Sequence, residues 1–303
     1  MKRFKNILVV YDVIPGCDET LQRAVDVATR NKAHLTVAHT VNPLSEERQT
    51  LDERDRLMKR VTGSLRLPPS QKSYVVRQGP GAECILKLAH EIGADLIISP
   101  DVTKGFYTRL LGFDVSTELL RRADCPVWIV RPQAAVHYRR IVAAVNVGKP
   151  DALSCPSNRR ILEMASSMAI LEEADLHVVY VWDYEGNERD MMHSELPPGR
   201  RQEISAQSRL KNLGLLVDLV EHVLGDFSRY TAVPIRGNPR AAIVDYIDQQ
   251  DADLLIIEGR IDGALKSVLT ENTATHLLNQ SNCSVLFSRT IAETQAVRTL
   301  EAV

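Results

Sequence analysis

One segment of this chain has residue types suited to binding a phosphate: Gly259-Arg260-Ile261-Asp262-Gly263-Ala264-Leu265-Lys266-Ser267. It follows a predicted strand and leads into a predicted helix, which is where open α/β sheets bind ligands. Three residues separate the two glycines and two separate Gly263 from Lys266, so the spacing does not match a Walker P-loop. One prediction is an anion site formed by Gly259, Arg260, Gly263, Lys266 and Ser267, and the other is a solvated loop.

The remaining reactive residue types show no catalytic or metal-binding pattern. The 8 histidines contain no His-x-x-x-His pair and the 5 cysteines no Cys-x-x-Cys, although zinc and redox motifs need such spacings. No Gly-x-Ser-x-Gly turn presents a serine nucleophile. Gly79-Pro80-Gly81 begins like a dinucleotide-binding loop but lacks its last glycine, so it predicts a tight turn. We therefore expect no catalytic residue, no metal and reduced cysteines.

The composition excludes several classes of protein. Hydrophobic residues make up 44% and charged residues 25% of the 303 residues, which is ordinary for a globular protein. The 37 Lys and Arg balance 39 Asp and Glu, which argues against a protein that binds the nucleic-acid backbone. No apolar run approaches the ~20 residues that span a bilayer, and no signal peptide precedes the first strand. We expect a cytoplasmic protein that neither binds nucleic acid nor inserts into membranes.

The chain repeats itself, and the repeat must position any site. An offset of 158 aligns Gly79 with Gly237. At the same offset, Ala94-Asp95-Leu96-Ile97-Ile98 aligns with Ala252-Asp253-Leu254-Leu255-Ile256, and Cys125-Pro126-Val127 with Cys283-Ser284-Val285. A period this long indicates domain duplication rather than a solenoid, because solenoid repeats are about 20–50 residues long. We predict domains at residues 1–133 and 138–291, followed by a tail at 292–303.

Short β-branched runs alternate with helix-period stretches in each copy. The predicted strands are residues 6–11, 34–41, 73–77, 95–99 and 126–130, then 140–146, 176–182, 231–235, 253–257 and 284–289. Ile7–Val10 and Leu96–Ile98 are apolar on both faces, which is typical of buried parallel strands. The alternation predicts a doubly wound α/β fold with a parallel sheet in each half.

Two long helical stretches carry apolar stripes that predict which face of each helix is buried. The highly charged stretch Glu46–Leu65 has Leu51, Leu57 and Val61 as a thin stripe. The stretch Arg200–Leu224 carries Leu210, Leu213, Leu216, Val217 and Val220. Such stripes usually pack against a core or a helix partner.

The order of these blocks resembles the universal stress protein family. The resemblance rests on Ile7-Leu8-Val9-Val10-Tyr11-Asp12, the Gly79 turn, Ala94-Asp95-Leu96-Ile97-Ile98 and Cys125-Pro126-Val127-Trp128-Ile129-Val130. Two such domains in one chain resemble the tandem, UspE-like members. The resemblance implies an adenine nucleotide alpha hydrolase-like fold, with a five-stranded sheet of order 3-2-1-4-5 in each half. It also implies a pseudo-dimer formed through the last strands, and makes a homodimer an expectation.

The ATP-binding members of that family carry a glycine motif after the fourth strand. The motif is Gly-x-x-Gly, nine residues, then Gly-Ser or Gly-Thr. This chain has Ser99, Val102, Gly112 and Phe113 at these positions in the first copy, and Ile257, Arg260, Thr270 and Glu271 in the second. Larger side chains keep backbone amides away from phosphates, and Glu271 would repel them. We predict that the ATP-binding motif is degenerate in both halves.

The resemblance adds further candidate ligand-binding residues. In ATP-binding members an aspartate at the end of the first strand contacts adenine, and Asp12 and Asn146 stand at this position in the two copies. Either residue could instead be a turn residue that accepts backbone amides. In the first copy, Thr103 and Lys104 lie in the loop equivalent to the Arg260 segment, and Gly112 is the motif glycine that is retained.

Together these features predict a cytoplasmic stress-response scaffold or sensor that is not an enzyme and needs no cofactor. Two alternatives stay open. One is a divergent ATP-binding protein with a remnant site in the second domain and a weak ATPase activity. The other is a carrier of an apolar or lipid-like ligand, because the replacements for the loop glycines would make that cleft more apolar.

Overall fold

The computed structural model describes residues 4–12, 17–41, 51–101, 115–131, 137–184, 192, 197–260 and 271–290. The chain divides into two compact units, Met1–Val136 together with Ser284–Val303, and His137–Cys283. The last strand of the second copy therefore groups with the first unit. The predicted boundaries 1–133, 138–291 and 292–303 follow the sequence repeat rather than these contacts, and they stay a prediction.

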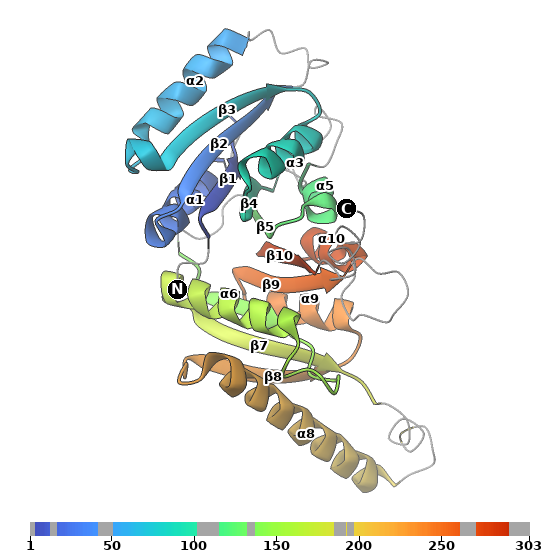
Figure 1. The fold of residues 1–303 in the computed structure, drawn as a ribbon. Helices are drawn as coiled ribbons and strands as arrows, with labels where there is room; N and C mark the ends of the chain where they lie inside the picture. Colours follow the sequence, from blue (N-terminus) through green and yellow to red (C-terminus); the bar gives the residue numbers. More distant parts are fainter. Residues whose placement is uncertain are drawn as a thin grey trace, which may run out of the picture. The chain divides into compact units, whose positions relative to one another are not determined.

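The first unit is a doubly wound sheet. Its elements are β1 (Asn6–Val10), α1 (Cys17–Asn31), β2 (His34–Val41), α2 (Leu51–Ser64), the 3-10 turn η1 (Pro69–Gln71), β3 (Lys72–Gln78), α3 (Gly81–Ile92), β4 (Leu96–Pro100), α5 (Val115–Arg122), β5 (Val127–Val130) and β10 (Ser284–Thr290). The strand order is β3-β2-β1-β4-β5-β10. Strands β1 to β5 are parallel, with α1 and α2 on one face and α3 and α5 on the other (Figure 1).

The second unit repeats this arrangement. Its elements are β6 (Arg140–Ala144), α6 (Pro156–Glu172), β7 (Asp175–Trp182), α8 (Pro198–Leu224), β8 (Tyr230–Arg236), α9 (Pro239–Gln249), β9 (Leu254–Arg260) and α10 (Glu271–Gln280). Its parallel strands run in the order β8-β7-β6-β9. Helices α6 and α8 contact each other over one face, and α9 and α10 lie against β7 and β9.

The predicted fold class and strand order are confirmed. In the first unit the strands of the first copy follow the order 3-2-1-4-5, and the second unit has the same order as far as its fourth strand. The last strands of the two copies also pair, as the family resemblance implied. Strand β10 runs antiparallel to β5, with Val285 opposite Ile129 and Phe287 opposite Val127.

The repeated Ala-Asp-Leu block has a structural reason. The carboxylate of Asp95 accepts hydrogen bonds from the backbone amides of Lys5 and Asn6, at 2.7 and 3.2 Å. In the second unit Asp253 accepts from the amides of Arg139 and Arg140, at 2.7 and 2.9 Å. Each aspartate thus fixes the start of the first strand of its copy beside the fourth strand.

The aligned glycines Gly79 and Gly237 form the same turn. Their φ angles are +141° and +148°, a region that residues with a side chain rarely adopt. Each donates its backbone N–H to the last residue of the second strand of its copy, Val41 at 3.0 Å and Trp182 at 2.9 Å. The tight turn predicted at Gly79 is therefore present, and it directs the chain from the third strand into the next helix.

We expect Gly79→Ala to destabilise the protein by about 2 kcal/mol, because it combines backbone strain with a clash. A Cβ at Gly79 would lie 2.9 Å from Sγ of Cys84, whereas one at Gly237 would meet its nearest atom, Cβ of Ala242, at 3.8 Å. The loss should therefore exceed that of Gly237→Ala in urea unfolding followed by circular dichroism. When Cys84 is also replaced by Ala, the two substitutions should lower the free energy of unfolding by similar amounts. If Gly79→Ala remained more destabilising than Gly237→Ala, the clash with Cys84 would not be its cause.

The buried faces of the two long helices differ from the predicted stripes. The buried residues of α2 are Arg54, Met58 and Thr62, so the predicted stripe is wrong. Leu51 at its start is instead 46% exposed. In α8, Leu216 and Val220 are buried as predicted, but Leu210 is 68% exposed. Neither α8 nor any other helix in the described part of the chain is long and apolar enough to cross a membrane.

Candidate functional site

The carboxyl end of β1 places Asp12 beside two basic side chains that were not among the predicted site residues. Its carboxylate lies 3.7 Å from Nδ1 of His39 on β2 and 3.7 Å from the guanidinium of Arg54 on α2. His39 and Arg54 are buried, while the side chain of Asp12 is 34% exposed. Asp12 thus combines access to solvent with a fixed electrostatic environment, as a binding residue or a turn residue would.

His39 is held by the backbone at this edge of the sheet. Its Nδ1 lies 3.0 Å from the carbonyl oxygen of Tyr11, which can only accept, so Nδ1 carries the proton. Nε2 is buried and has no hydrogen-bond partner among the described residues. The neighbouring hydroxyl of Tyr11 donates to Asp18 at 3.0 Å. Burial, and then this bond, raises the pKa of Tyr11 well above its usual value, so the phenol stays neutral.

The carboxyl end of β4 holds a buried ion pair. Asp101 directly follows β4, its side chain is fully buried, and it pairs with Arg131, which directly follows β5 and is also buried. The backbone amide of Arg131 donates to Oγ of Ser284 on β10, at 3.2 Å. This pair joins the ends of two neighbouring strands. The predicted ligand-binding residues of this half, Thr103, Lys104 and Gly112, lie outside the described residues.

In the second unit Asn146 is a turn residue. Its Oδ1 accepts from the amide of Gly148 at 3.0 Å. Its own amide donates to Oδ1 of Asn158 at 3.1 Å, and its carbonyl accepts from Nδ2 of Asn158 at 2.8 Å. These bonds close the loop after β6 onto α6. They favour the turn role over the ligand-binding role for Asn146.

The predicted loop after the fourth strand of the second copy begins later than expected. Gly259 and Arg260 are the last residues of β9, which runs to Arg260 rather than ending at residue 257. Glu258, within this strand, is buried although it carries a carboxylate. The side chain of Arg260 and residues Gly263, Lys266 and Ser267 lie outside the described part of the chain.

Glu258 carries a buried carboxylate near the end of β9, much as Asp101 does after β4, although the repeat aligns Asp101 with Gly259. Its side chain is 1% exposed and pairs with the guanidinium of Arg160 on α6, whose Nε lies 3.2 and 3.3 Å from the two carboxylate oxygens. Nη2 of Arg160 also donates to the same carboxylate. Each fourth strand therefore ends beside a buried carboxylate paired with an arginine. Sequence reasoning missed both pairs; the signal was a charged residue directly after four or five apolar or small strand residues.

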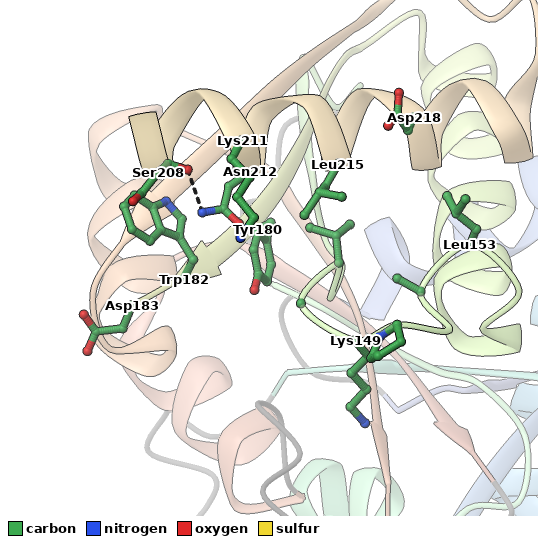
Figure 2. Close-up of a pocket in the computed structure, with 14 residues that line it drawn as sticks. Lys149, Leu153, Tyr180, Trp182, Asp183, Ser208, Lys211, Asn212, Leu215 and Asp218 are labelled. Carbon is green, nitrogen blue, oxygen red and sulfur yellow. Dashed lines mark hydrogen bonds between the residues drawn. The ribbon is translucent and has the colours of Figure 1, made fainter. Parts of the chain in front are cut away.

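The second unit also contains a cavity of about 600 Å³. It lies between the loop after β6, the carboxyl end of β7 and α8 (Figure 2). Tyr180 and Trp182 from β7 form its aromatic side, and Val147, Leu153 and Leu215 add aliphatic surface. This volume falls within the range of small-molecule sites, about 300–1,000 Å³. This cavity could not be predicted from the sequence, because its walls come from three separate segments.

Close contacts shape this cavity. A Cβ at Gly148 would clash with the hydroxyl oxygen of Tyr180, so a larger residue there would have to displace the Tyr180 ring. Trp182 meets Tyr184 edge to face, with ring centroids 5.4 Å apart. Tyr184 is in turn covered by Arg236, whose Nη1 donates to its hydroxyl at 2.9 Å. The aromatic side is therefore held in place before any ligand arrives.

The described residues contain neither a candidate metal cluster nor a disulfide. No group of three or more His, Cys, Asp or Glu among them could hold a metal ion. None of the five cysteines forms a disulfide. Burial, and then the charge of Asp95, raises the pKa of Cys125 to about 12, so this thiol is protonated at neutral pH.

Comparison with known proteins places both copies in one family. The sequence profile of the Universal stress protein family matches residues 3–131 and 137–289. Universal stress protein E of Photorhabdus laumondii is 22% identical, covering 94% of this chain and 95% of that protein. A Universal stress protein E homolog of Haemophilus influenzae is 24% identical, covering 94% and 97%. A crystal structure of a functionally unknown Pseudomonas aeruginosa protein shares the fold, with a TM-score of 0.68, 22% identity, and coverage of 95% and 93%.

Proposed function

The chain belongs to the universal stress protein family, and we propose that it acts as a cytoplasmic stress-response scaffold or sensor in which neither half uses ATP. The observation that carries this proposal is the pair of buried carboxylates, Asp101 directly after β4 and Glu258 two residues before the end of β9. A triphosphate bound there needs backbone amides and positive charge. Asp101 and Glu258 instead bring negative charge to these strand ends, and the arginines beside them are already paired with these carboxylates.

The residues that replace the motif glycines support the same proposal. Ser99 is buried within β4, and Ile257 is fully buried within β9, so neither exposes the backbone as a glycine would. The cations Arg131 and Arg160 face carboxylates rather than an open loop. A chain that has lost most glycines of the phosphate-binding motif is poorly suited to stabilising the charge that develops in phosphoryl transfer. We therefore propose a binding or scaffolding role rather than an enzymatic one.

We also propose that the two copies act as an intrachain pair. The antiparallel pairing of β5 with β10 supports this arrangement, because it uses the last strand of each copy. A homodimer of the whole chain remains a separate prediction, which sedimentation of the purified protein tests.

We expect no binding of ATP tighter than about 1 mM in isothermal titration calorimetry with Mg²⁺, and no ATP hydrolysis above background. The reason is the loss of motif glycines, which would let backbone amides approach the phosphates, together with the buried carboxylates. A control titration of Arg260→Ala separates this proposal from the alternative of a remnant site. Micromolar binding by the unsubstituted protein that is lost in Arg260→Ala would refute the proposal and establish a nucleotide site in the second half.

A further inference from the structure

We infer that the cavity beneath α8 binds a neutral, planar aromatic molecule that carries a hydrogen-bond-accepting oxygen, such as an aryl ketone. This inference goes beyond the proposed function and does not depend on it, because no lining residue belongs to the phosphate-binding positions. The class of ligand follows from three features of the cavity: its aromatic side, an unsatisfied donor, and balanced charge.

The shape and lining select an aromatic ligand. The rings of Tyr180 and Trp182 lie along one side, and Leu215 of α8 lies across from the loop that carries Leu153 (Figure 2). Leu153 and Leu215 border the cavity and are 45% and 37% exposed. A ligand that covers them would remove this apolar surface from water. Aromatic rings also gain from offset or edge-to-face contact with a fixed tryptophan.

The indole N–H of Trp182 favours a ligand with a hydrogen-bond acceptor. The residue is 6% exposed, and its Nε1 is buried with no hydrogen-bond partner in the described part of the chain. A buried donor without an acceptor is unfavourable. The indole lies beneath α8 beside Ser208, at one end of the cavity (Figure 2). A ligand oxygen that reaches this end would satisfy the donor, so the site should prefer an aryl ketone to a plain aromatic molecule.

The charged residues around the cavity select a neutral ligand. Lys149 and Lys211 are matched by Asp183 and Asp218, so the lining has no net charge. The side chain of Lys149 points away from α8 (Figure 2). A phosphate or a carboxylate would gain from the lysines and lose as much to the aspartates. The cavity is therefore suited to a neutral molecule of two or three rings rather than to a nucleotide.

The test uses 6-propionyl-2-dimethylaminonaphthalene, a neutral naphthyl ketone whose emission shifts to shorter wavelength in apolar surroundings. We expect saturable, micromolar binding with a blue shift when the full-length protein is titrated. ATP added in excess should not displace it, which keeps this result separate from the nucleotide titration. An absence of saturable binding would overturn the inference.

A matched pair of variants locates the site. Leu215→Asp places a charge on the cavity wall at a position exposed enough to leave the fold intact, and should weaken binding on the order of tenfold. Leu210→Asp makes the same change one turn and a half away on α8, at a 68% exposed leucine outside the cavity lining, and should change nothing. Equal effects of the two variants, or none, would show that the probe binds elsewhere.

A second probe tests the donor. N-phenyl-1-naphthylamine has a similar size and no carbonyl oxygen, and we expect it to bind about fivefold more weakly than the ketone. Trp182→Phe keeps an aromatic side chain and removes the N–H, so it should bring the two affinities together. A ketone preference that survives in Trp182→Phe, with native circular dichroism, would exclude Trp182 as the donor.

Discussion

Arg131→Ala is expected to lower the free energy of unfolding by about 3–5 kcal/mol. The substitution removes the arginine partner of Asp101, whose side chain is fully buried at the end of β4. An ionised carboxylate without its counter-ion is much less stable in a low-dielectric interior than in water. The loss should be seen in urea unfolding, with Trp128 in the first unit and Trp182 in the second as the two intrinsic fluorophores.

The control for this prediction is an ion pair at the surface of the same unit. Arg121 pairs with Glu118 one turn earlier on α5, at 3.2 Å, and its side chain is 52% exposed. Arg121→Ala should change stability by less than about 1 kcal/mol, because solvent screens exposed pairs. Asp101→Asn provides a second variant that keeps the shape of the side chain. If Arg131→Ala were no worse than Arg121→Ala, the buried pair would not hold the ends of β4 and β5 together.

Much of the fold could be predicted because its causes are local or repeated. Strands β1 and β4 are apolar on both faces, and only a buried parallel strand accepts that pattern. Gly79 and Gly237 align because both take a backbone conformation that favours glycine. Asp95 and Asp253 align because each binds the amides at the start of a neighbouring strand. In these cases the residue type itself is what the structure requires.

The candidate site could not be predicted in the same way, because tertiary contacts decide which side chains lie next to one another there. Arg54, Arg131 and Arg160 look like surface cations in the sequence, yet each faces a carboxylate on another element. The few leucines of α2 gave a stripe that is not its buried face, because Arg54 and Thr62 occupy that face instead. The lack of space beside Gly148 likewise cannot be predicted from the sequence, because it depends on the placement of Tyr180.

The second large effect on stability is expected at the ion pair of Arg160 with Glu258 in the second unit. Arg160→Ala should destabilise the protein by about 2–3 kcal/mol, less than Arg131→Ala, because the Arg160 side chain is 37% exposed and partly screened. Glu258→Gln keeps a hydrogen-bonding group of the same shape and should cost about 1–2 kcal/mol. Urea unfolding followed by the fluorescence of Trp182, in the same unit, measures both variants.

The double variant Arg160→Met with Glu258→Met shows what the pair contributes. Replacing a buried ion pair by apolar side chains is often neutral, so the double variant should lie within about 1 kcal/mol of the unsubstituted protein. It also removes the carboxylate from the end of β9 without restoring any glycine. We expect it still to bind no ATP, because Ile257 keeps that backbone covered. Nucleotide binding by the double variant would mean that the charge of Glu258 alone had excluded phosphate, and that the loop after β9 retains a working anion site.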